Sequence, residues 1–530
     1  MTAAPLAVLE LSTRLLRRGA LILVAAGGAY VAVEVISYLQ SYPDQASRAR
    51  LAAFQDNPSI RMIQGLAHNV DTVGGFVAWD GGWFLQTLVA IWAMLSVLRL
   101  TRGDEEADRS VLVLVAPVAA RQVLQLQLIV VSGAVLLFSA TCSLVLVAYG
   151  VPLRGASLFG LSLAGFGATL AAVAAVCAQL FVVRRRAVGV ASGVLAAAYF
   201  VRMIGNSTDA RGWLRWFTPY GWMDDLQPYG DPRWAALVLL VLSPVALAGL
   251  AAALRSHRDT GGAILATSDR RRPRIRLLGS PLAFAWRGTR GVLIAWALGL
   301  GTYALLIGSL LPALTDYLLN DPGLLKTMAT LGVDVSDITK GMVGFMSTMF
   351  GLAFSLYACW RIGAVRAEEE SGRADLLLVR PLSRPRWLGG HLALGAAGLG
   401  GLAILTGLAM WAGGRVTGAE LSLGDALRAT ANTVPVALLF LALAVLVLSL
   451  RPRLTVPLSA GLAGVAYLLP PLGSALSLPL WVRDLSPFQH LAVVPVHPYA
   501  VTSGLLMLGL AAGLAVLGVT AFTRRDLAGA

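Results

Sequence analysis

The chain has 530 residues, of which 57% are hydrophobic and only 13% are charged, whereas about 25% of the residues in a soluble domain are charged. The formal net charge is +14 and the mean hydropathy is +0.73. This composition excludes an array of soluble domains and predicts an integral membrane protein with apolar helices of about 20 residues.

An amphipathic stretch opens the chain, and about twelve apolar runs of sufficient length follow it. Residues 1–19, MTAAPLAVLELSTRLLRRG, predict a short interfacial helix, because their charges follow an apolar run and so lack the order of a signal peptide. The expected spans have the approximate limits 19–40, 76–99, 124–149, 156–183, 187–205, 233–254, 290–313, 341–363, 388–412, 432–450, 454–473 and 499–522. We therefore expect an all-α membrane protein with about twelve transmembrane helices.

The arginines predict the orientation of these spans. When both termini are placed in the cytoplasm, most of the 42 basic residues fall in cytoplasmic segments, as the positive-inside rule requires. The Arg-rich segment 256–281 contains no aromatic residue for stacking on bases, so we expect no nucleic-acid partner. It predicts a solvated linker that contacts anionic membrane lipid.

Two charged segments of similar sequence interrupt the apolar chain. The first charged segment, residues 102–124, reads RGDEEADRSVLVLVAPVAARQVL, and the second charged segment, residues 366–388, reads RAEEESGRADLLLVRPLSRPRWL. At one constant spacing, Arg102 matches Arg366, Glu105 matches Glu369, Glu106 matches Glu370, Arg109 matches Arg373, and Pro117 matches Pro381.

A second repeated motif supports an internal duplication. WLRWFTPY (213–220) recurs as WVRDLSPF (481–488). We predict two six-span halves, residues 1–255 and 282–530, joined by the linker 256–281. Because each half has an even number of spans, the halves have the same orientation and are related by an axis along the membrane normal, with a pathway between them.

Within each charged segment, the charges fall at helical spacing. The expected i,i+4 ion pairs are Arg102–Glu106, Glu105–Arg109, Arg366–Glu370 and Glu369–Arg373, each worth a few tenths of a kcal/mol. The apolar run and proline that follow predict a short helix across the cytoplasmic face and a turn back into the membrane. Two interpretations stay open: a solvated loop with surface ion pairs, or two docking sites for a symmetric partner.

The same residues carry a family resemblance. EEESGRADLLLVRPLSR, and more loosely EEADRSVLVLVAPVAAR, resembles the coupling segment of ABC-2 type exporter permeases. WFTPYGWMDDLQPYGDPRW (216–234) and LPLWVRDLSPFQHLAVVP (478–495) resemble outer loops of the large fused actinobacterial permeases associated with tetronasin, polyketide or multidrug export.

The resemblance implies a bacterial plasma-membrane exporter with an amphiphilic cargo such as a drug, an antibiotic or a lipid-like compound. It implies that the charged segments contact two copies of a separate ATPase subunit, which carry ATP and Mg²⁺. The residues implied in this coupling are Arg102, Glu105, Glu106, Arg109, Pro117, Arg366, Glu369, Glu370, Arg373 and Pro381. The sequence has no Gly-Lys-Ser/Thr phosphate-binding motif, so we expect no nucleotide cofactor and no ATPase activity in this chain.

Other candidate residues lie inside the expected spans. Glu34, in the first span, is a functional candidate that carries a proton or attracts a cation, unless it reaches water at the outer end. By the resemblance, the pathway is lined by the aromatic residues Trp92, Tyr199, Phe354, Tyr357 and Tyr467, although helix packing explains each of them as well. The five histidines are scattered and predict no metal site.

One other class of function stays open. Twelve spans in two parallel halves also describe proton-coupled secondary transporters of the major facilitator architecture. Such a transporter would depend on Glu34 and on the proton gradient rather than on ATP.

Overall fold

The computed structural model describes residues 3–51, 58–265, 279–320, 337–370, 372, 374, 379, 382–475 and 478–525. Every regular element in these ranges is a helix, and twelve of the helices are long and apolar enough to cross a membrane. The predicted all-α membrane fold with twelve spans is therefore confirmed.

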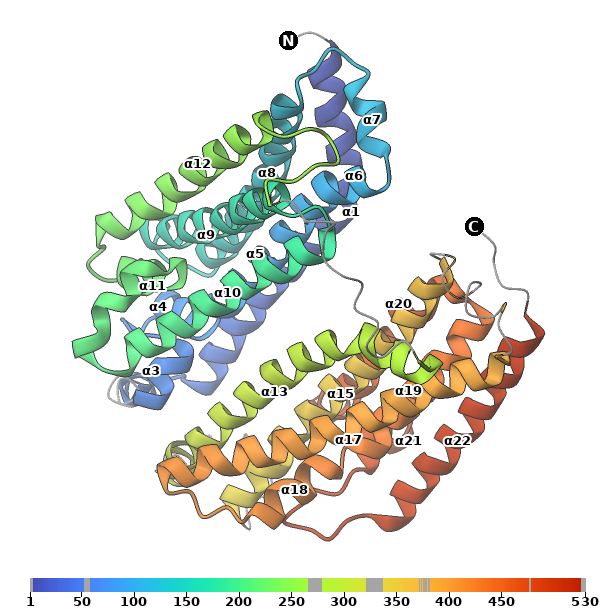
Figure 1. The fold of residues 1–530 in the computed structure, drawn as a ribbon. Helices are drawn as coiled ribbons and strands as arrows, with labels where there is room; N and C mark the ends of the chain where they lie inside the picture. Colours follow the sequence, from blue (N-terminus) through green and yellow to red (C-terminus); the bar gives the residue numbers. More distant parts are fainter. Residues whose placement is uncertain are drawn as a thin grey trace. The chain divides into compact units, whose positions relative to one another are not determined.

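The chain divides into two compact units, Met1–Arg271 and Arg272–Ala530. Each unit contains six of the long apolar helices (Figure 1). The boundary between the units lies inside the predicted linker 256–281.

Unit 1 is built around α9 (Leu153–Leu180), which packs against helices on several sides (Figure 1). The other spans are α1 (Ala3–Ser41), α5 (Gly82–Leu98) with its continuation through η2 (Arg99–Gly103) and α6 (Asp104–Glu106), α8 (Ala120–Ala148), α10 (Arg184–Ser207) and α12 (Trp234–Ser256). The shorter helices are α2 (Gln45–Arg50), α3 (Pro58–Gln64), α4 (Val73–Asp80), α7 (Arg109–Leu114), η3 (Asp209–Phe217) and α11 (Pro219–Leu226).

Two features of unit 1 follow from its sequence. Helix α9 is rich in glycine and alanine, and a Cβ on Gly165 would stand 2.7 Å from the carbonyl oxygen of Leu240 in α12. Small residues thus let the two helices approach closely. The short helix expected at the N-terminus is continuous with the first span, because α1 is one helix from Ala3 to Ser41.

Unit 2 contains six spans in the same chain order. They are α13 (Pro281–Asn320), α15 (Ile338–Glu370), α17 (Arg384–Thr417), the pair α18 (Leu423–Ala431) and α19 (Val434–Leu450), α20 (Thr455–Ala475) and α22 (Val501–Arg524). The short helices are η4 (Pro452–Leu454), α21 (Leu480–Arg483) and η5 (Pro487–His490). Helix α19 begins just before Pro435, whose missing N–H suits the first turn of a helix.

Helices α13 and α17 of unit 2 meet backbone to backbone. A Cβ on Gly308 would collide with the carbonyl oxygen of Met410, and a Cβ on Gly413 would collide with that of Leu305. We expect Gly308→Ala to lower the free energy of unfolding by about 1–3 kcal/mol, because the added methyl group forces the helices apart.

The matched control is Gly299→Ala on the same helix. A Cβ there meets nothing within 4 Å, and alanine favours the helical conformation. Thermal unfolding in detergent should therefore separate the two variants, and equal midpoints would contradict the close contact.

The repeated motifs 213–220 and 481–488 make the same two hydrogen bonds in both units. Thr218 Oγ1 donates to Ala198 O at 2.8 Å, and Ser486 Oγ donates to Ala466 O at 2.5 Å. Each hydroxyl oxygen also accepts the backbone N–H two residues later. The hydroxyl residue before each proline thus ties the loop to the fifth span of its unit, as an internal duplication predicts.

Candidate functional site

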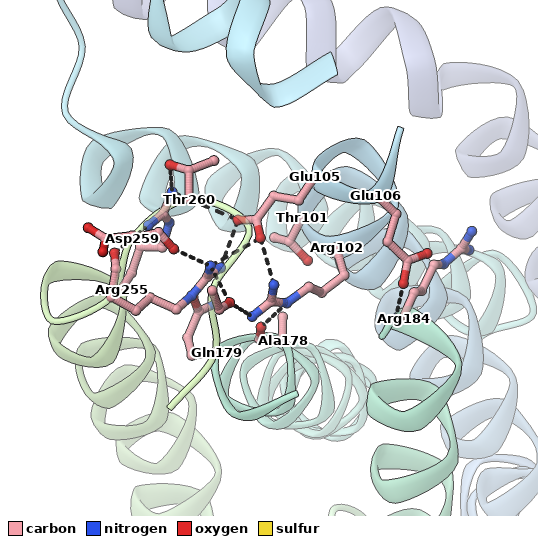
Figure 2. A network of polar contacts seen from close by, with 12 residues as sticks. Thr101, Arg102, Glu105, Glu106, Ala178, Gln179, Arg184, Arg255, Asp259 and Thr260 are labelled. Atoms are coloured by element: carbon pink, nitrogen blue, oxygen red, sulfur yellow. Dashed lines mark hydrogen bonds and ion pairs between the residues drawn. The ribbon is translucent and has the colours of Figure 1, made fainter. Parts of the chain in front are cut away.

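The first charged segment begins inside the helix that forms the second span. Arg102 is only 1% exposed, although it is a charged residue near a helix end. Its Nε donates to Ala178 O at 2.5 Å, its Nη1 to Glu105 Oε2 at 2.8 Å and its Nη2 to Gly262 O at 2.7 Å (Figure 2). Arg102 therefore joins α5, the end of α9 and the segment after α12.

Glu105 is the central acceptor of this network. Its side chain is 7% exposed, and its two oxygens lie 2.7 and 3.1 Å from Nη2 and Nη1 of Arg258. Arg255 Nη2 lies 3.8 Å from the same carboxylate. Three guanidinium groups thus surround one carboxylate. The carbonyl groups at the end of α9 carry a partial negative charge, which adds to the negative charge of this carboxylate.

The beginning of the predicted linker belongs to this network. Ile264 N donates to Gln179 O at 3.0 Å, and Leu265 N donates to Leu180 O at 3.1 Å. Arg258 Nε donates to Gln179 Oε1 at 2.8 Å. These hydrogen bonds fold residues 257–265 of the predicted linker onto the end of α9, although most of these residues are exposed. The arginine run at 270–276 lies outside the described residues.

The second charged segment begins on the last turn of α15. The buried Glu369 accepts from Arg525 Nη2 at 2.5 Å. Arg366 donates to Glu370 Oε1 at 2.5 Å and to Arg453 O at 3.0 Å. The predicted pair Arg366–Glu370 is confirmed. The predicted pair Glu369–Arg373 and the turn residue Pro381 involve positions outside the described residues.

The predicted pairs of the first charged segment are wrong. Arg102 contacts Glu105 rather than Glu106, which instead accepts the backbone N–H of Arg184 at the start of α10 (Figure 2). Arg109 contacts Asp104 at 2.7 Å. Arg109 does not reach Glu105 because Asp108, which lies between them, has a left-handed conformation (φ 53°) that interrupts the helix.

An apolar surface remains exposed beyond these ion pairs. Helix α7 carries Val111 and Leu112, the latter 77% exposed, and Val115 follows at 81%. Pro117 lies in the turn between α7 and α8, as predicted. Val379, which matches Val115 in the repeat, is 87% exposed. We call Val111, Leu112 and Val115 the α7 apolar face.

Glu34 has polar partners in unit 1. It is hydrogen-bonded to Asp80 at the end of α4 and to Tyr30 on its own helix, and Gln64 Nε2 donates to Asp80 Oδ1 at 2.7 Å. Within the described ranges, no group of three or more His, Cys, Asp or Glu residues could hold a metal ion.

The five aromatic candidates occupy different environments. Phe354 and Tyr357 are buried in the core of unit 2, and Trp92 lies against Gly19 of α1. Packing explains these three.

Tyr199 and Tyr467 form a repeated contact. The ring of Tyr199 lies 5.3 Å from that of Tyr220, and the ring of Tyr467 lies 5.5 Å from that of Phe488, both edge to face. Arg202 stacks on Tyr199 and pairs with Asp224 at 2.7 Å. The two ring pairs correspond because Tyr220 and Phe488 are the last residues of the repeated motifs 213–220 and 481–488.

The sequence analysis missed Arg258 and Arg525. Each lies directly after the last span of its half, and each contacts the matching glutamate of a charged segment. A search for arginines at the end of both halves could have found them, but only the structure pairs them with Glu105 and Glu369.

Comparison with known proteins identifies the family of this chain. The family described as "Multidrug efflux system permease Rv1217c, C-terminal domain" matches residues 7–258 and 278–523, one stretch in each unit. The chain belongs to this family. It is also 32% identical over 498 residues to the multidrug efflux system permease protein Rv1217c of Mycobacterium tuberculosis (strain ATCC 25618 / H37Rv), covering 93% of this chain and 90% of that protein. With its twelve apolar helices, this member of the Rv1217c family is a transmembrane efflux permease.

Proposed function

We propose that this permease is the membrane part of an ATP-driven exporter of the ABC-2 type, powered by two copies of a separate ATPase subunit that bind ATP and Mg²⁺. The α7 apolar face carries the proposal. It lies between two spans rather than within one, and exposed apolar surface of this kind marks a site of contact with a partner. The equally exposed Val379 supplies a matching contact in unit 2.

The buried ion pairs support a mechanical role for the charged segments. Arg102 and Glu105 fix the start of the first charged segment to α9, so a partner that displaces α7 also displaces the helix ends. ATP binding would close the two ATPase subunits, and the two halves would rock from an inward-open to an outward-open state.

The proposed cargo is amphiphilic. The Mycobacterium tuberculosis relative is named a multidrug efflux permease, and we propose a drug, an antibiotic or a lipid-like compound for this chain. The proposed location is the bacterial plasma membrane, with both termini in the cytoplasm. The distribution of arginines between the loops supports this orientation.

A proton-driven transporter is the second candidate, and the Glu34–Asp80 hydrogen bond favours it. The two candidates predict opposite results for Glu34→Gln. ATP-driven efflux of a fluorescent amphiphilic dye should stay within about twofold of the unaltered chain, since the proton is not the energy source.

Glu34→Asp is the control for this experiment, because it keeps the carboxyl group. Dye efflux that is lost in Glu34→Gln, kept in Glu34→Asp and abolished by a protonophore would replace the ATP-driven proposal with the proton-driven one.

A further inference from the structure

The same three-way contact occurs once in each unit. In unit 1, Arg258 follows the sixth span, binds Glu105 at the end of the second span and donates to Gln179 at the end of the fourth span. In unit 2, Arg525 follows the sixth span, binds Glu369 at the end of the second span, and its Nη1 donates to Leu448 O at 3.1 Å near the end of the fourth span. We call each arginine with its two partners an arginine junction.

The two junctions agree in topology but differ in chemistry. The acceptor on the fourth span is a side-chain amide in unit 1 and a backbone carbonyl in unit 2. Arg102 also reaches Glu105 in unit 1. A contact that recurs with different acceptor groups depends on the position of the arginine rather than on one local motif.

We propose that Arg258 and Arg525 are matched positioning residues that join the ends of the second, fourth and sixth spans of each unit, so that the three helices move together. The inference rests on the proposed function for what drives this movement, although the junctions themselves do not depend on it. In unit 2, loss of the arginine removes the ion pair between Glu369 and the end of the sixth span, so displacement of the charged segment would no longer be passed on through it. In unit 1, Arg255 of α12 also lies 3.8 Å from Glu105.

The burial of the ion pairs suits this role. The side chains of Arg258 and Glu105 are 3% and 7% exposed, so salt screens their attraction little. Arg525 is partly exposed and stacks on Phe522 at 5.1 Å. Unit 2 is the better place for a test, because Arg525 is the arginine that pairs with Glu369, whereas Arg102 and Arg255 also reach Glu105 in unit 1. Loss of Arg525 leaves the buried Glu369 without this partner, so the test includes a charge exchange that restores the pair.

The test compares Arg525→Ala with Arg524→Ala, a neighbouring exposed arginine of equal charge. Each variant is reconstituted in lipid vesicles with the purified ATPase subunit, and dye transport is measured per ATP hydrolysed. We expect Arg525→Ala to lower this ratio at least fivefold while hydrolysis continues. Arg524→Ala should stay within twofold of the unaltered chain. The exchange Glu369→Arg with Arg525→Glu should recover at least half of the ratio.

Two results would overturn the inference. One is an unchanged ratio in Arg525→Ala, and the other is an equal fall of transport and hydrolysis, which a merely structural role would give. If the unaltered chain binds no ATPase, the proposed function fails instead. The same variants are then compared by dye efflux from cells at equal membrane levels. Loss in Arg525→Ala with recovery in the exchange supports the junction, and unchanged efflux contradicts it.

Discussion

Glu105→Ala should destabilise unit 1 more than any other substitution considered for this chain. The variant leaves Arg102, Arg258 and Arg255 buried around an empty position. Removing one partner of a buried ion pair costs about 3–5 kcal/mol, because the remaining charge stays uncompensated. For a unit of this size, the unfolding midpoint should fall by roughly 10 °C, as measured by thermal unfolding in detergent.

Glu10→Ala is the matched control within the same unit. Glu10 and Arg14 form an i,i+4 pair on α1 with side chains 63% and 70% exposed, and such a pair contributes less than about 0.5 kcal/mol. Equal unfolding midpoints for Glu105→Ala and Glu10→Ala would show that the buried network does not stabilise unit 1.

The second large effect concerns the α7 apolar face. Leu112→Asp combined with Val115→Asp places two carboxylates on a surface that we propose to be covered by the ATPase subunit. Loss of a central apolar contact of an interface costs about 2 kcal/mol or more, which is at least a 30-fold loss of affinity. We expect that loss when the purified ATPase subunit is titrated onto the purified permease.

The fold of this double variant should remain intact, because exposed substitutions change stability by about 0.5 kcal/mol or less. Val416→Asp is the control, since Val416 is exposed near the end of α17, on the face predicted to be outside the cell. Unchanged affinity in the α7 variant, or an equal loss in the control, would remove α7 from the docking site.

Much of the fold follows from the sequence because membrane spans depend on local apolar composition. The twelve spans, including the Gly-rich run 187–205 that becomes α10, were predictable in this way. The long single helix α1 was not, because nothing in a charged N-terminal stretch distinguishes a bent helix from a continuous one.

The candidate site was predictable in place but not in detail. The repeat identified both charged segments, and spacing predicted Arg366–Glu370. Spacing failed for Glu105 because it assumes an unbroken helix, whereas Asp108 ends the helix. It also could not show that Arg258, more than 150 positions later in the chain, competes for the same carboxylate.

The most direct test of the account is dye transport by the purified permease in lipid vesicles with and without the purified ATPase subunit. We expect transport only when the ATPase subunit and hydrolysable ATP are both present, with no loss when a protonophore collapses the proton gradient. Transport driven by a proton gradient in the absence of the ATPase subunit would contradict it.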